Sequence, residues 1–125
     1  MTRAVPDAQD QTLFGWLKTL YPIWAAMRPD DFFTSAQIGM AELLLSGCTT
    51  TSDHLYIYPN GARLEDTIDA ANEIGMRFQP TRGAMSIGES DGGLPPDNLV
   101  QHEPEILEDM IRVIDAFHDP SHGSM

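Results

Sequence analysis

Four polar side chains stand where chemistry could occur: Asp53 and His54 in one segment, and Thr81 and Arg82 in a later one. An imidazole can hydrogen-bond a substrate, transfer a proton or bind a metal ion. A guanidinium can clamp a carbonyl or carboxylate group with its planar fork. Each has a structural alternative, since His54 could bond a neighbouring loop and Arg82 could form an ion pair with Asp53. The residue types alone leave these alternatives open.

Each polar pair stands at the end of a stretch that predicts a β-strand. Cys48 to Leu55 contains three consecutive threonines and follows the helix stop Gly47, and Met76 to Pro80 reads as a second short strand. The carboxyl ends of parallel strands meet at one sheet edge, where α/β enzymes keep their active sites, so the two pairs are expected to lie together. Because Asp53 and His54 are adjacent, only one of them can face the interior of a barrel unless the strand carries a bulge.

Apolar residues at helical spacing predict the helices that position these strands. Leu13 begins such a pattern, and Pro22 interrupts it, so two short helical pieces are expected there. Trp16 and Trp24 share a helical stripe only if Pro22 does not break the helix, and core packing is the default expectation for both. Further helices are expected from Pro29 to Gly47, over 64–74, and from Pro104 to Phe117.

The order of the elements predicts an α/β fold with a parallel sheet built by right-handed crossovers. Residues 83–101 form a loop rich in Gly, Ser, Asp and Pro, far longer than the usual connection of about 4–6 residues. Long loops of this kind often carry function. Two strands cannot cover three apolar helix faces, so the chain is expected to be part of a larger α/β protein.

Composition narrows the classes of partner. The 125 residues allow one small domain, and 42% apolar content is enough for a core. Seven basic against nineteen acidic residues give a net charge of −12, which disfavours nucleic acid and anionic membrane surfaces. Cys48 has no partner for an internal disulfide, and neither a signal peptide nor an apolar stretch of about 20 residues is present. We therefore expect a cytoplasmic protein.

Three segments, residues 43–54, 74–86 and 91–96, resemble the amidohydrolase superfamily in sequence and in order. Within it they are most similar to the branch of 8-oxoguanine deaminases and hydroxyatrazine-type aminohydrolases. The resemblance implies a partial (β/α)₈ TIM barrel, roughly strands 2 and 3 with their flanking helices. Residues 1–125 would then be part of a single barrel domain that lacks its N-terminal metal-binding strand and its C-terminal half.

The resemblance also implies a reaction. Family members use zinc or another divalent metal, held in part by a His-x-His pair that this sequence lacks, for hydrolytic deamination of a ring. The implied function is deamination of a purine-like base such as 8-oxoguanine, by an enzyme that forms homo-oligomers at full length. No metal ligand and no catalytic residue is assigned to this chain, which alone is expected to be inactive. The alternatives are a triazine aminohydrolase and a non-catalytic, acidic α/β interaction domain.

Three residues are predicted to bind the small-molecule substrate. Arg82, in the Thr-Arg-Gly motif, matches an arginine that related deaminases use on their substrate, and Trp16 matches an aromatic residue of the loop that covers the site. His54 is expected to line or support the pocket. Leu94 stands where related nucleoside deaminases have a second arginine, which favours a free base or a triazine over a nucleoside.

Overall fold

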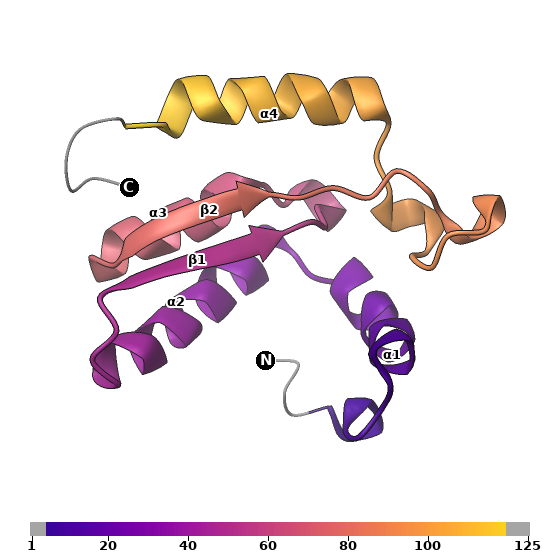
Figure 1. Cartoon of the computed structure of the whole chain (residues 1–125), viewed down its shortest axis with the longest axis horizontal. Coiled ribbons are helices and arrows are strands. Elements are labelled where there is room, and N and C mark those ends of the chain that lie inside the picture. The colour runs from indigo at the N-terminus through magenta and orange to yellow at the C-terminus, as the bar shows by residue number, and fades with distance from the viewer. Residues whose placement is uncertain (1–4, 120–125) are drawn as a thin grey trace.

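The computed structural model describes residues 5–119 as helices arranged around a two-stranded parallel sheet (Figure 1). Strand β1 (Thr50–Leu55) pairs with β2 (Arg77–Arg82), with Thr50 opposite Arg77 and Leu55 opposite Arg82. The predicted parallel pairing is therefore confirmed. Both strands point toward α1 and the 83–101 loop, while α4 runs alongside β2 (Figure 1). The α-helices are α1 (Leu13–Ala25), α2 (Pro29–Leu45), α3 (Leu64–Ile74) and α4 (Glu103–Phe117).

Two glycine stops fix where the strands begin. Gly47, at φ +90°, ends α2, and the backbone N–H of Cys48 then bonds the carbonyl of Leu43 at 2.9 Å. This hydrogen bond is the mark of a Schellman motif, and it holds Cys48 in the helix end, so β1 starts later than expected. Gly75, at φ +74°, ends α3 in the same way before β2.

The expected interruption at Pro22 is wrong, because α1 is one continuous helix with Pro22 inside it. A proline leaves the carbonyl four residues earlier without its helical partner. Here that residue is Lys18, an exposed residue of the helix. Pro22 also lies in the last turn of the helix, where little hydrogen bonding remains to be lost.

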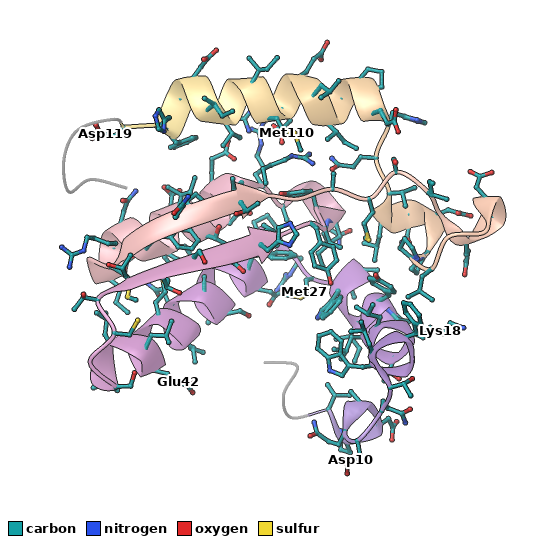
Figure 2. All side chains as sticks on the ribbon, in the orientation of Figure 1. Asp10, Lys18, Met27, Glu42, Met110 and Asp119 are labelled. Carbon is teal, nitrogen blue, oxygen red and sulfur yellow. The ribbon has the colours of Figure 1, made fainter. Side chains whose placement is uncertain are left out.

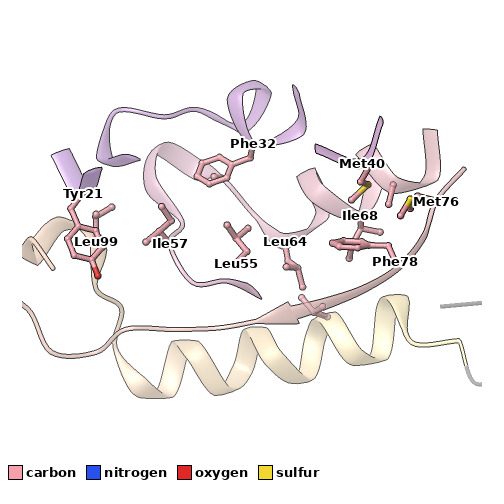
Figure 3. Packing of buried hydrophobic residues seen from close by; sticks show 13 residues of the cluster. Tyr21, Phe32, Met40, Leu55, Ile57, Leu64, Ile68, Met76, Phe78 and Leu99 are labelled. Atoms are coloured by element: carbon pink, nitrogen blue, oxygen red, sulfur yellow. The ribbon is translucent and has the colours of Figure 1, made fainter. Parts of the chain in front are cut away.

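The core lies between the sheet and the helices α2 and α3 (Figure 3). Phe78 of β2 is 1% exposed, and Leu55 of β1 is also buried. They pack in one cluster with Phe32 and Met40 of α2 and with Ile68 of α3. The residues of β1 and β2 that alternate with Leu55 and Phe78 have side chains on the other face of the sheet, and they are exposed. The helices therefore cover only one face of the sheet.

Helix α4 carries more apolar surface than the described residues cover. Val113 is buried, but Leu107, Ile111 and Ile114 are each about three-fifths exposed on a second stripe of the helix. The sequence predicted such uncovered surface from two strands and three apolar helix faces. Among the helices of residues 5–119, none is both long and apolar enough to span a membrane.

Candidate functional site

His54 and Asp53 lie on opposite faces of β1. Asp53 lines a cavity with Phe32 and Ser35 of α2, so it is on the helix-covered face. His54 is exposed, pairs in register with Thr81 and rests against Gly83 just beyond β2. It therefore lies on the open face, which would be the interior in a barrel.

An aromatic cluster of Trp16, Tyr21, Trp24 and Tyr56 extends from α1 to the end of β1. Trp16 and Trp24 meet edge-to-face at 5.5 Å between ring centroids, and Trp24 meets Tyr56 at 6.4 Å. The ring of His54 lies 6.0 Å from that of Tyr56. Trp24 and Tyr56 line one cavity with Met27, which Figure 2 labels near the end of β1.

Two rings of the cluster, Trp24 and Tyr56, line a cavity of about 160 Å³ together with His54 and Met27. Trp16 and Trp24 come together because α1 continues through Pro22, and both are only half-buried. Trp24 packs partly against the core, Trp16 packs on Trp24, and part of each ring stays accessible. Aromatic edges and an imidazole at one strand end can bind a flat heteroaromatic ring by stacking and hydrogen bonding.

Two contacts hold α1 over the strand ends. Asn60, at φ +53° in the turn after β1, donates from its side-chain amide to the carbonyls of Ala25 at 2.9 Å and Met27 at 2.7 Å. The hydroxyl of Tyr21 donates to the sulfur of Met85 at 3.6 Å. Helix α1 is thus tied to the segments that follow both strands.

Arg82 lies on the opposite face from His54 and is tightly bound. Its Nε pairs with Asp109 Oδ2 at 2.9 Å, its Nη1 donates to the carbonyl of Gly83 at 2.9 Å, and its Nη2 donates to Gln101 Oε1 at 2.8 Å. The side chain is 5% exposed. The alternative of an ion pair with Asp53 is therefore wrong: the carboxylate partner is Asp109, which no local sequence signal singles out.

The Arg82 guanidinium belongs to a larger charged network. Arg112 bonds Asp109 at 2.8 Å and Glu65 at 2.6 Å, which links α4 to α3. Burial alone would raise the pKa of the Asp109 carboxyl, but hydrogen bonds from Arg112 and Arg82, and their charge, bring that pKa below its ordinary value. Asp109 therefore stays ionised as a fixed partner of Arg82.

Tyr58 also contacts the Arg82 guanidinium. Its ring lies 4.4 Å from the Arg82 guanidinium carbon, and its hydroxyl donates to the carbonyl of Leu55 at 2.9 Å. Burial raises the pKa of Tyr58, so the hydroxyl remains a donor. The cation–π contact and the hydrogen bond together fix Arg82 against the end of β1.

The 83–101 loop has an internal structure of its own. Asp97 accepts hydrogen bonds from the backbone and the hydroxyl of Ser90, and the N–H of Gly93 bonds the carbonyl of Gly88 at 2.8 Å. A side chain at Gly88 would collide with Asp97, so the close approach requires glycine. Leu94 is half-buried and packs against the core. The loop is thus folded on itself rather than a loose connector.

The structure brings Trp16 and His54 toward one side of the sheet and places Arg82 on the other. Sequence reasoning missed Tyr56 and Gly83 as neighbours of His54. A signal for Tyr56 was available, because residues two apart on an extended strand share a face. Within residues 5–119, no three His, Cys, Asp or Glu side chains come together to hold a metal ion.

Comparison with known proteins places this geometry among deaminases and hydrolases. The chain is 48% identical, over 99% of its length, to 8-oxoguanine deaminase of Pseudomonas aeruginosa. It is 37% identical, over 86% of its length, to hydroxydechloroatrazine ethylaminohydrolase of Pseudomonas sp. strain ADP. It spans only 28% and 23% of those two proteins. No family model matches it.

Solved structures agree with these relatives. A triazine hydrolase variant aligns with 94% of the chain at a TM-score of 0.85 and 28% identity. The atrazine chlorohydrolase of Arthrobacter aurescens TC1, solved in complex with zinc, aligns at a TM-score of 0.83 and 28% identity. In both cases the chain covers 28% of the solved protein.

Proposed function

Since this segment belongs to the amidohydrolase superfamily, we propose that it forms roughly the second and third strands, with their flanking helices, of a (β/α)₈ barrel enzyme. Residues 1–125 would be one part of a single barrel domain. The open edges of β1 and β2 and the uncovered stripe of α4 support this proposal, because further strands and helices of a barrel would cover them. We call the longer chain that this proposal requires the full-length protein.

The proposed reaction is hydrolytic deamination of a purine-like base such as 8-oxoguanine. The observation that carries it is the 48% identity with an 8-oxoguanine deaminase across 99% of the chain. A divalent metal such as zinc would supply an activated water, as in other metal hydrolases. The described residues do not form a site that fits such an ion. We therefore assign no metal ligand and no catalytic step to this chain.

The contribution of this segment would be substrate binding at the open face of the sheet. His54 would hydrogen-bond the ring, and Trp16 with the rest of the aromatic cluster would bind its flat surface and exclude water. The half-buried state of both tryptophans supports this role, because a fully packed ring would have no free surface to offer. Direct substrate contact by Arg82 was predicted from the sequence and is untested, and the burial of its side chain favours an indirect role.

The test is ammonia release by the full-length protein from 8-oxoguanine and from hydroxyatrazine. Deamination of 8-oxoguanine is expected, and turnover of neither compound would refute the proposal. The variant His54→Ala should raise KM by about 3–10-fold, the value of one ordinary hydrogen bond. His102→Ala is the matched control, because His102 is exposed before α4 and its side chain makes no capping bond. Metal content should be the same in both variants.

A triazine aminohydrolase is the second candidate. It is favoured by the 37% identity with hydroxydechloroatrazine ethylaminohydrolase and by the triazine hydrolase structures. Leu94, half-buried against the core, does not separate the two substrates, since neither carries a sugar. The ratio of kcat/KM for the two compounds decides between them.

The third hypothesis is a non-catalytic interaction domain, for which the 125 residues alone would form the folded unit. Under this hypothesis the 125-residue chain should unfold cooperatively as a monomer and bind little hydrophobic dye. The barrel proposal predicts dye binding at the exposed stripe of α4. Homo-oligomer formation and cytoplasmic location belong to the same proposal, and size-exclusion chromatography with light scattering tests the first.

A further inference from the structure

We propose that Arg82 is a positioning residue, which clasps the two ends of the 83–101 loop and thereby sets the site at the open face. The effect on substrate rests on the proposed deaminase function, whereas the clasp itself is a property of the fold. Arg82 would then act through the loop rather than by touching substrate.

One guanidinium reaches both ends of the loop. Nη1 donates to the carbonyl of Gly83, the first residue of the loop, and Nη2 donates to the side chain of Gln101, the last. The backbone N–H of Gln101 in turn bonds the carbonyl of Met85 at 2.9 Å. The two ends of the loop are therefore joined through Arg82 and by a direct backbone hydrogen bond.

The clasp is itself held rigidly. Asp109 pairs with Nε, and Arg112 fixes Asp109 by two further hydrogen bonds at 3.0 and 2.8 Å. Tyr58 lies over one face of the guanidinium. Three of the five N–H donors are used on three different partners, and the side chain is only 5% exposed, so little of the guanidinium is open to a ligand.

The alternation of side chains along β2 places Arg82 on the opposite face of the sheet from the proposed substrate site. Arg82 pairs in register with Leu55, whose side chain is in the core, whereas Thr81 pairs with His54 on the open face. Side chains on successive strand residues point to opposite faces. The Arg82 side chain therefore lies under α4, away from the imidazole.

Two contacts link the 83–101 loop to the residues of the proposed substrate site. Gly83 lies directly against His54, where a methyl group would come within 2.8 Å of Nε2. Met85 accepts the hydroxyl of Tyr21, which meets Trp24 edge-to-face at 5.7 Å. A loop that moved would displace both His54 and the aromatic cluster.

The experiment is hydrogen exchange on the substrate-free, full-length protein with Arg82→Lys and Gln101→Ala. Lysine keeps the charge but not the fork, so the bonds to both loop ends cannot be kept together. The backbone amides of Gln101, Gly93 and Glu89, which are hydrogen-bonded in the loop, should exchange about 10–100-fold faster in Arg82→Lys. Gln101→Ala should shift Gly93 and Glu89 in the same direction by a smaller factor.

Arg77→Lys is the matched control. It makes the same change on the same strand, at an exposed arginine that bonds only Thr49 and Thr50 among the contacts described for it. Exchange in the loop should stay at the value of the unmodified protein. In steady-state kinetics, both Arg82→Lys and Gln101→Ala should raise KM with little change in kcat.

The proposal is overturned if loop exchange in Arg82→Lys equals that of the control while KM rises, because direct substrate contact would then explain the effect. It is also overturned if Gln101→Ala changes neither exchange nor KM. Should Arg82→Lys fail to fold, Gln101→Ala alone decides by the same two readouts. If no purine or triazine is turned over, the proposed function fails, and the exchange rates still decide whether Arg82 is a clasp.

Discussion

Gly83→Ala should destabilise the protein and displace His54, because the structure leaves no room for a methyl group there. The N–H of Gly83 bonds the carbonyl of Leu55 at 2.7 Å, so the backbone cannot retreat easily. An added Cβ would lie 2.8 Å from His54 Nε2 and 2.8 Å from Tyr56 Cβ. The imidazole can swing away, but the Cβ of Tyr56 is fixed to the backbone of the chain leaving β1.

The magnitude comes from overpacking alone. The φ angle of Gly83 is not in the left-handed region, so alanine brings no backbone strain. Overpacking a well-filled site costs about 1–3 kcal/mol in the free energy of unfolding. Gly39→Ala is the control, since Gly39 lies inside α2 with nothing within 4 Å of an added Cβ. That change should stabilise the helix by about 0.5–1 kcal/mol.

The assay is urea unfolding of the full-length protein, together with NMR of the His54 imidazole. Gly83→Ala should lower the unfolding midpoint and shift the imidazole resonances, whereas Gly39→Ala should do neither. Equal stability of the two variants would refute the expectation that a methyl group does not fit at Gly83. Unchanged imidazole resonances in Gly83→Ala would show that His54 does not rest on this glycine.

Three further outcomes are expected. Because the pKa of Asp109 is lowered in the fold, its stabilising effect is complete above its ordinary value of 3.8 and is lost as the pH falls through the lowered pKa; urea midpoints measured against pH should show an acid-side loss that Asp109→Asn reduces. Asn60→Ala removes two hydrogen bonds from the end of α1, which should cost about 1–3 kcal/mol, and alanine at φ +53° should add about 1 kcal/mol, with faster amide exchange in α1. Gly75→Ala places a side chain at φ +74° and should cost about 1–2 kcal/mol by thermal or urea unfolding, with the site unchanged.

The elements of this fold were predictable because their signals are local. Gly47 and Gly75 end the helices, and the threonines of β1 favour an extended chain. Pro22 was misjudged for a reason that is not local. Its cost depends on whether the carbonyl of Lys18 reaches water and on how near the helix end lies, and neither can be read from the proline itself.

The site was only partly predictable. The period of two on a strand predicted that Asp53 and His54 face opposite ways, but the two faces were not assigned from the sequence. Leu55 held the answer, since an apolar residue two positions after Asp53 places Asp53 on the core side. The partner of Arg82 was beyond such reasoning, because Asp109 lies on a helix that follows a long loop.

Adjacent residues at the end of β2 therefore serve two different faces. Thr81 belongs with His54 on the open face, and Arg82 belongs with Asp109 beneath α4. A change on the open face alters what a ligand meets, whereas a change on the helix face alters where the loop lies. Both are expected to raise KM, so kinetics alone cannot assign an arginine to substrate contact. Amide exchange without substrate separates the two cases, because a change in the helix-face network should loosen the loop even when no ligand is bound.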